Sequence, residues 1–147
     1  MLISTKGRYA IRVMIDLAQQ NANGYVPLKE IANRQGISEK YLESIISLLS
    51  KAGLVGGVRG KGGGYKLTRD PEEYTAWEIL TTANGTLAPV ACLQNGAPGC
   101  ERSEICKSLP LYENLYELEE IYLKSIKLPQ LVNGNVPTVD DFLGKAQ

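Results

Sequence analysis

The feature that most constrains the fold is a change of hydrophobic period near residue 54. In residues 7–20, 28–35 and 38–52, apolar side chains recur at three- and four-residue spacing, which predicts three helices. The next segment, 54–68, instead favours two short strands joined by the glycine-rich run 60–64, as in a tight hairpin. Three helices followed by a hairpin are typical of a winged helix-turn-helix.

Glycine, proline and serine residues mark the ends of these predicted helices. Pro27 opens the second helix, because proline is favoured at a first helical position, and Gly36 ends it. Ser38 is a good N-cap for the third helix, and Gly53 suits the left-handed conformation that often follows a helix. The apolar residues expected to face the core are Ala10, Val13, Met14, Leu17 and Ala18, then Leu28, Ile31 and Ala32, then Leu42, Ile45, Ile46 and Leu49.

The second half of the chain predicts two further helices separated by a loop. Thr75 and Glu78 form a capping-box pattern, and Trp77 and Leu80 are expected to pack on the first helix. Residues 84–103 are expected to form a loop. A helix over residues 110–126 would be about 25 Å long. Because that exceeds what a closed core needs, we expect it to pair with its copy in a second subunit. Its packing seam is Leu111, Leu115, Leu118, Tyr122 and Ser125.

These elements predict a mainly α chain with a small β-hairpin wing and a long C-terminal dimerisation helix. We expect a winged helix-turn-helix DNA-binding domain over residues 1–83 and a cysteine loop over 84–109. The dimerisation helix then covers residues 110–127, and 128–147 form a C-terminal tail.

The net charge of zero conceals a division between the two halves. Residues 1–70 carry 11 basic and 5 acidic side chains, a balance of +6. Residues 71–147 carry 5 basic and 11 acidic side chains, a balance of −6. Such asymmetry indicates nucleic-acid binding by the basic half.

The residues expected to contact DNA lie on the second helix of the helix-turn-helix and on the wing. The helix enters the major groove, and an arginine on a narrow hairpin suits the minor groove. Simpler interpretations stay open: Ser38 as a helix cap only, Tyr41 as a core residue and Glu43 as a solvated charge. The candidate DNA-binding residues are Ser38, Lys40, Tyr41, Glu43, Ser44, Arg59, Gly60 and Lys61.

Several classes of protein are excluded or disfavoured by what the sequence does not contain. There is no histidine, which removes the commonest general base and metal ligand. The glycine run lacks the ending of a nucleotide-binding P-loop and is not followed by a helix. No catalytic constellation is visible, so we expect a non-enzyme. No signal peptide and no apolar run of membrane-spanning length is seen, so we expect a cytoplasmic protein.

Three cysteines, Cys92, Cys100 and Cys106, fall within 15 residues at C-x7-C-x5-C spacing. The close cysteine pairs of zinc fingers are absent. Thiolates clustered on a glycine- and proline-containing loop suit an iron–sulfur cluster, although such clusters normally take four ligands. Redox-active thiols, or cysteines without a special role, are the alternatives that the spacing leaves open.

Three segments resemble the Rrf-two family of bacterial transcription regulators: Ile3–Ala10 (ISTKGRYA), Ile37–Glu43 (ISEKYLE) and Val58–Tyr65 (VRGKGGGY). The resemblance implies a homodimeric winged-helix repressor that binds a roughly palindromic operator. By position it places Ser38, Lys40, Glu43 and Ser44 in the major groove, and Arg59 and Gly60 in the minor groove. It also implies that Cys92, Cys100 and Cys106 hold a cluster, [2Fe–2S] rather than [4Fe–4S], whose loss, oxidation or nitrosylation changes the posture of the DNA-binding half.

Two departures from the family pattern leave the fourth cluster ligand open. Leu109 stands where cluster-binding members have a histidine, and Arg8 where some nitric-oxide sensors have an aspartate. An external small molecule is one candidate ligand, and the others are Glu101, Ser103, Glu104 and Ser108. The main alternative is a cluster-free regulator controlled by a protein partner or by thiol oxidation. A small redox protein without DNA binding is a third hypothesis, which the basic wing disfavours.

Overall fold

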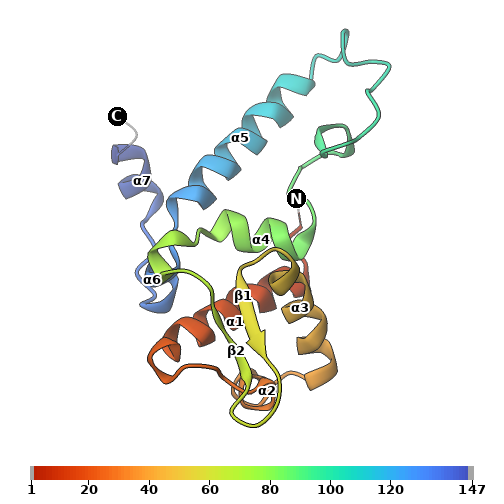
Figure 1. The fold of residues 1–147 in the computed structure, drawn as a ribbon. Helices are drawn as coiled ribbons and strands as arrows, with labels where there is room; N and C mark the ends of the chain where they lie inside the picture. The colour runs from red at the N-terminus through yellow and green to blue at the C-terminus, as the bar shows by residue number, and fades with distance from the viewer. Residues whose placement is uncertain (1, 146–147) are drawn as a thin grey trace.

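The computed structural model describes residues 2–145, and it is mainly helical with one two-stranded antiparallel sheet (Figure 1). The strands are β1 (Val55–Val58) and β2 (Gly64–Leu67). Three short 3-10 turns are η1 (Asn21–Asn23), η2 (Pro71–Glu73) and η3 (Ala91–Leu93). The α-helices are α1 (Thr5–Gln19), α2 (Leu28–Gln35), α3 (Glu39–Lys51), α4 (Ala76–Asn84), α5 (Leu109–Ser125), α6 (Leu128–Val132) and α7 (Val139–Lys145). The predicted order of three helices, hairpin and two later helices is confirmed.

The predicted helix ends rest on side-chain caps. The hydroxyl of Ser38 accepts a hydrogen bond from the backbone N–H of Tyr41 at 3.1 Å, and Gly36 ends α2 with a left-handed φ of 64°. Thr75 likewise accepts from the N–H of Glu78 at 3.1 Å. The predicted return bond of the capping box is wrong, because the Glu78 carboxylate pairs with the guanidinium of Arg69 at 2.7 Å instead.

The hydrophobic core lies between α1, α2, α3, α4 and the base of the hairpin. Leu80 of α4 is buried beside Gly7 of α1, as predicted. Trp77 was expected on α1 as well, but its ring faces Tyr116 of α5, with 5.9 Å between the ring centroids. The reason is that α4 lies between α1 and α5, and its buried face is already filled by Ala76, Ile79, Leu80 and Ala83.

The hairpin is attached at both of its ends to segments that flank the helices. At its base, the buried Tyr74 hydroxyl donates to the carbonyl of Leu54 at 2.7 Å. The same oxygen accepts from the N–H groups of Thr68 and Arg69, each at 3.0 Å. Farther along, Tyr65 of β2 exchanges two backbone hydrogen bonds of 2.8 Å with Val26. The hairpin is therefore a fixed wing rather than a free loop.

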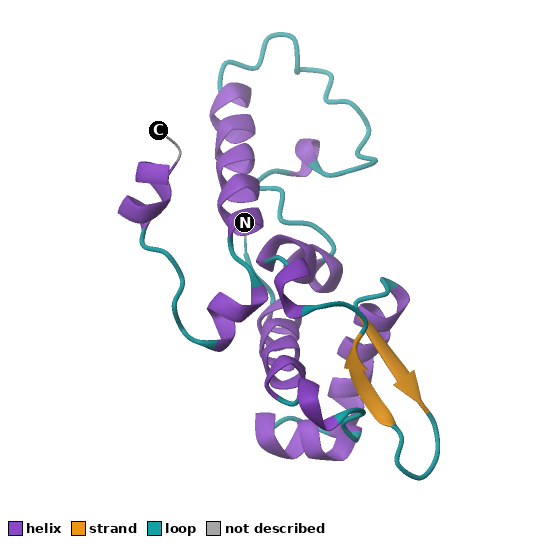
Figure 2. Ribbon diagram, turned by 60° about the vertical axis from the view of Figure 1, so that its left-hand side comes forward, coloured by secondary structure: helices purple, strands orange, loops and turns teal. Residues whose placement is uncertain are grey.

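The helix α5 stands away from this core, as Figure 2 shows. It contains no buried residue, and Leu111, Leu118 and Ile121 are 65%, 53% and 50% exposed. Ile126 and Leu128, which follow it, are buried and hydrogen-bond to Ala76 and Tyr74. The carboxyl end of α5 is therefore fixed to the start of α4.

The segment expected to be a plain tail contains two helices within its described part, α6 and α7. Leu128 of α6 is fully buried, and Phe142 of α7 meets the ring of Tyr122 edge-on at 5.4 Å. Each of these helices is short and is held by one apolar side chain, so its hydrophobic pattern is too short to be recognised in the sequence. Among the described helices, none has the length and apolar character that crossing a membrane would require.

Candidate nucleic-acid interface and cysteine loop

A buried carboxylate fixes the helix-turn-helix in place. Asp16 of α1 is 2% exposed and accepts hydrogen bonds from Arg34 at 2.8 and 3.0 Å and from the Gln35 amide at 2.8 Å. The hydrogen bond to Asp16 raises the pKa of Arg34 above its usual value. This network was not predicted from the sequence, although an aspartate inside the apolar stripe of a helix is a signal for a buried partner. Its effect is to hold α2, and hence the turn before α3, on α1.

The amino end of α3 presents three of its five candidate residues to solvent. Ser38, Lys40 and Glu43 are exposed. Tyr41 is half-buried, packs on the core and meets the ring of Tyr9 edge-on at 5.7 Å. The Ser44 hydroxyl donates to the Tyr41 carbonyl at 2.7 Å. Lys40 and Glu43 are therefore free to meet a ligand, and Ser38 is exposed while its hydroxyl oxygen also caps the helix. Tyr41 positions the helix.

The tip of the wing carries the remaining candidates. Arg59, Gly60 and Lys61 are exposed, and neither cation forms an ion pair within residues 2–145. The turn closes with a hydrogen bond of 3.0 Å from the N–H of Gly63 to the carbonyl of Gly60. A Cβ on Gly63 would lie 2.2 Å from the Val58 carbonyl oxygen, so this turn requires glycine there.

A groove lies beside one of the helix candidates, Glu43. It has a volume of about 250 Å³ and runs between one side of α3 and the wing. Lys66 on β2 also lies 4.8 Å from the centre of the Tyr25 ring, a cation–π contact that the sequence analysis did not foresee. The groove is lined by Glu43, Ile46, Ser47, Ser50, Lys51 and Tyr65. The groove therefore adjoins Glu43 of α3 and the strand β2, but none of the candidates at the wing tip.

The three cysteines lie on the loop between α4 and α5, at the opposite end of the molecule from the wing tip (Figure 1). All three are free thiols; Cys92 and Cys100 are exposed and Cys106 is half-buried. A hydrogen bond with Ser108, whose oxygen is 3.4 Å from the Cys106 sulfur, lowers the pKa of Cys106. Within residues 2–145, no three Cys, Asp or Glu side chains gather closely enough to hold a metal ion.

The candidate fourth ligands likewise form no group with the three cysteines among the described residues. Glu101, Ser103 and Glu104 are exposed on the loop, and Leu109 begins α5. Arg8 lies on α1 and donates to the Thr5 hydroxyl at 3.3 Å. No side chain is singled out as a fourth ligand by this conformation of the loop.

The comparison with known protein families identifies the family of this chain. The family model described as an iron-dependent transcriptional regulator, Rrf2, matches residues 3–134. The chain belongs to the Rrf2 (Rrf-two) family. Membership confirms the predicted family and makes the chain a transcription regulator rather than an enzyme.

Individual Rrf2 relatives agree with this assignment. The chain is 40% identical over 134 residues to the HTH-type transcriptional regulator IscR of Serratia proteamaculans, covering 91% of this chain and 80% of that one. The IscR of Photorhabdus laumondii is likewise 40% identical over 134 residues, with the same shares covered.

Solved Rrf2 structures confirm the predicted winged-helix fold. CymR, the global cysteine regulator of B. subtilis, is 35% identical with a TM-score of 0.69, covering 91% of this chain and 98% of that one. The IscR of T. potens is 35% identical with a TM-score of 0.68, covering 100% of this chain and 89% of that one. This Rrf2 chain therefore resembles both regulators over almost its full length.

Proposed function

We propose that this Rrf2-family regulator is a homodimeric repressor whose operator binding is controlled by an iron–sulfur cluster on Cys92, Cys100 and Cys106. The observation that carries the proposal is the division of the molecule into two ends. One end presents the amino end of α3 and the unpaired cations of the wing, and the other presents three free thiols.

For DNA binding, the exposed side chains of α3 suit the major groove of a palindromic operator. Ser38 can contact bases or phosphates, Glu43 can accept from a cytosine amino group, and Lys40 can meet phosphate. Arg59 projects from a narrow hairpin and suits the strong negative potential of a narrow minor groove. Gly60 and Lys61 beside it bring backbone and charge close to the phosphates.

For the dimer, α5 offers the surface that the single chain leaves uncovered. Its side chains Leu111, Leu118 and Ile121 are at least half exposed, and the helix buries none of its residues. An exposed apolar helix face in a small protein marks an interaction site. We assign residues 1–83 to DNA binding, 84–109 to the cysteine loop and 110–127 to dimerisation. The segment 128–147 contains α6, which packs on α1, and α7, whose Phe142 contacts Tyr122 of α5.

For the cluster, the donor set fits although the cysteines lie apart. Cluster iron is held by thiolates, and the hydrogen bond from Ser108 already favours the thiolate of Cys106. The loop contains glycine and proline and packs little, so its exposed cysteines can approach one another. When bound, a [2Fe–2S] cluster would supply a redox-active centre sensitive to oxidation and nitric oxide. The open candidates for the fourth position stay Glu101, Ser103, Glu104, Ser108 and an external ligand.

The chain links its two ends through α4. The cysteine loop begins where α4 ends, and α4 packs against both α1 and α3. At its other end, the segment before α4 holds the wing through Tyr74. A conformational change of the loop therefore has a packed route to the recognition helix.

A second candidate function keeps DNA binding without the cluster. The separation of the three thiols favours it, since each is free to react alone or to be covered by a protein partner. The regulator would then respond to thiol oxidation or to that partner. In either case we place it in the cytoplasm, where a bacterial chromosome is transcribed.

Anaerobic purification from an iron-replete host separates the two candidates. We expect a coloured protein containing iron and inorganic sulfide, and loss of the colour in Cys92→Ala, Cys100→Ala and Cys106→Ala. Ile105→Ala is the matched control, because Ile105 is 67% exposed on the same loop and has no ligating atom. A colourless, iron-free wild type would overturn the cluster and favour the cluster-free regulator.

A further inference from the structure

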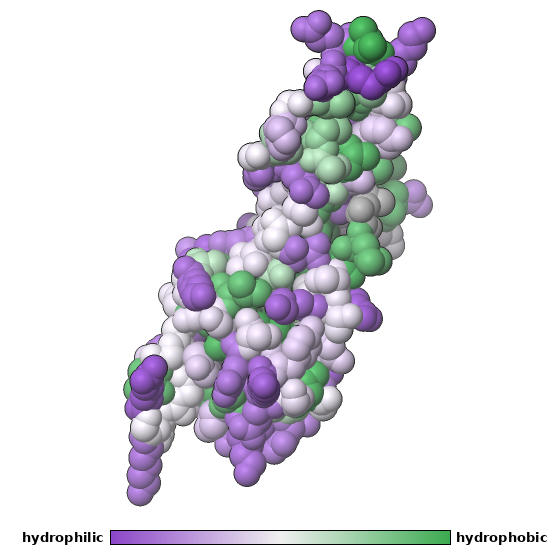
Figure 3. Space-filling view, turned by 90° about the vertical axis from the view of Figure 1, so that its right-hand side faces the viewer, coloured by the Kyte–Doolittle hydropathy of each residue, from purple (hydrophilic) through white to green (hydrophobic). Residues whose placement is uncertain are grey.

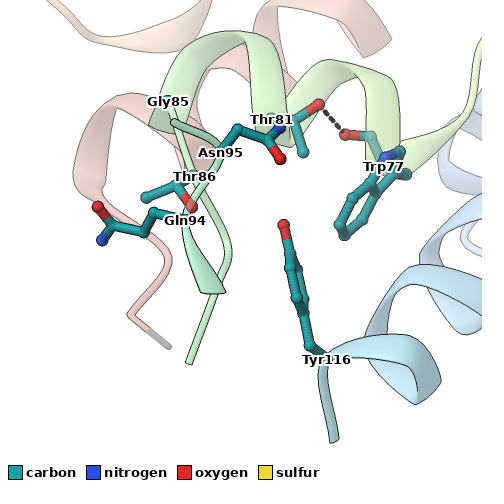
Figure 4. A pocket seen from close by; sticks show the side chains of 7 residues that line it. All are labelled: Trp77, Thr81, Gly85, Thr86, Gln94, Asn95 and Tyr116. Carbon is teal, nitrogen blue, oxygen red and sulfur yellow. Dashed lines mark hydrogen bonds between the residues drawn. The ribbon is translucent and has the colours of Figure 1, made fainter. Parts of the chain in front are cut away.

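A cavity of about 350 Å³ lies between α4, the start of the cysteine loop and α5. It is separate from the wing and from the cysteine sulfurs. Its volume falls in the range of small-molecule sites, about 300–1,000 Å³. Figure 4 shows its lining, which is Trp77, Thr81, Gly85, Thr86, Gln94, Asn95 and Tyr116.

Two aromatic rings form one wall of the cavity. Trp77 comes from α4 and Tyr116 from α5, with their ring planes tilted by 46°. In Figure 4 the Tyr116 hydroxyl points into the space below the Asn95 amide and beside the Trp77 ring. A flat molecule entering the cavity would therefore contact an aromatic surface.

Unused hydrogen-bonding groups surround this wall. The Thr81 and Thr86 oxygens are partly engaged, since Thr81 donates to the Trp77 carbonyl at 2.7 Å and Thr86 accepts from the Ala88 N–H at 3.1 Å. Within residues 2–145, the Asn95 amide, the Tyr116 hydroxyl and the Trp77 indole N–H have no hydrogen-bond partner. An amide presents a donor and an acceptor side by side.

The lining contains no charged side chain. A site of this kind gives no compensation for burying a carboxylate, phosphate or ammonium group. The ligand that it favours is uncharged, planar and able to pair with an amide. An Asn side chain makes two hydrogen bonds to the edge of adenine, and aromatic side chains stack on bases.

We propose that this cavity binds an uncharged purine nucleoside as a small-molecule effector, with the base on the Trp77–Tyr116 wall and paired to Asn95. The site joins three elements, so an occupant would fix the relative position of α4, the cysteine loop and α5. Asn95 lies three residues after Cys92 on the same loop. The effector would therefore act beside the cysteines without using them.

The single tryptophan of the chain makes the test direct, because all tryptophan fluorescence comes from this cavity. Adenosine titrated into the full-length protein should change the fluorescence of Trp77 saturably. Asn95→Ala and Tyr116→Ala should weaken adenosine binding about 5- to 150-fold, the range for losing one stacking or edge contact. Asn114→Ala, at an exposed asparagine of α5 outside the cavity, should bind as wild type.

A conservative variant and a charged ligand complete the test. Tyr116→Phe keeps the ring and should retain most of the affinity even if Tyr116→Ala fails to fold. Adenosine monophosphate should bind no more tightly than adenosine, since no charged side chain lines the cavity and the nearest cation, Lys124 beside the Trp77 ring, is already paired with Glu120. The proposal is overturned if adenosine causes no saturable change up to millimolar concentration, or if Asn95→Ala binds it as well as wild type does.

Discussion

At the scale of single residues, a substitution of Arg59 gives the most direct test of DNA binding. It is exposed on the wing, and no described residue pairs with its guanidinium. We expect Arg59→Ala to weaken operator binding by about 1–3 kcal/mol per half-site, measured by fluorescence anisotropy. Its melting temperature should stay that of wild type, because the side chain supports no folded contact. Operator binding equal to that of wild type would contradict the assignment.

Glu119 is a second residue with a measurable consequence. One of its carboxylate oxygens is buried in an apolar groove between α5 and α7 and has no hydrogen-bond partner among residues 2–145, and this burial raises the pKa of Glu119. The folded state thus binds the proton more tightly than the unfolded state. The stability that this provides is present in full below the ordinary carboxyl pKa and is lost as the pH rises through the raised value.

We therefore expect Glu119→Gln to raise the melting temperature at pH 8 and to leave it unchanged at pH 4. The gain should be below about 1 kcal/mol, a few degrees at most, because the side chain stays partly solvated. Glu113→Gln, at an exposed position of the same helix, should change little at either pH. A lower melting temperature of Glu119→Gln at pH 8 would show that the charge is stabilising.

At the scale of elements, the wing depends on a close backbone approach at Gly64. Its φ is 146°, and a Cβ there would lie 2.3 Å from the Val26 carbonyl. We expect Gly64→Ala to cost about 1–3 kcal/mol and to expose the paired amides of Val26 and Tyr65 to hydrogen exchange. Gly62→Ala, with a φ of 77° and open space around it, should cost only about 1–2 kcal/mol and preserve that protection. Equal protection in both variants would contradict this account of the wing.

Tyr74 holds the base of the wing through one buried hydroxyl. Tyr74→Phe would leave the Leu54 carbonyl and the N–H groups of Thr68 and Arg69 without this partner. We expect a loss of about 1–3 kcal/mol in urea unfolding. Tyr112→Phe removes a hydroxyl that bonds no described residue and should be neutral. A neutral Tyr74→Phe would mean that the hydroxyl is not needed to anchor the wing.

The same elements show where sequence reasoning succeeds and where it stops. Ser38 and Gly36 act through local backbone chemistry, so they placed the helix-turn-helix correctly. Trp77 was misplaced because its neighbour depends on how α5 crosses α4, which no local pattern specifies. The bond of Glu78 to Arg69 likewise joins residues from different elements. The gathering of the three cysteines depends on a ligand and on loop conformation, so spacing alone could suggest it but not establish it.

At the scale of the whole molecule, the charges are separated along the same axis as the proposed functions. The basic half contains α3 and the wing, and the acidic half contains the cysteine loop and α5. On the face drawn in Figure 3, hydrophobic residues gather in the upper middle, below a mostly hydrophilic top, and the lower end is also mostly hydrophilic. Binding should therefore depend steeply on salt, with log affinity falling by roughly 0.9 per neutralised phosphate for each unit of log salt.

The most direct test of the central claim is the operator affinity of one anaerobic preparation before and after iron removal. The operator can be selected from random duplexes by the protein itself, and affinity measured at fixed salt. We predict at least a tenfold difference between the two forms, and none between the same two treatments of the Cys92→Ala variant. Equal affinity of the wild type with and without iron would contradict cluster control. The protein would then be a DNA-binding regulator that responds to a different signal.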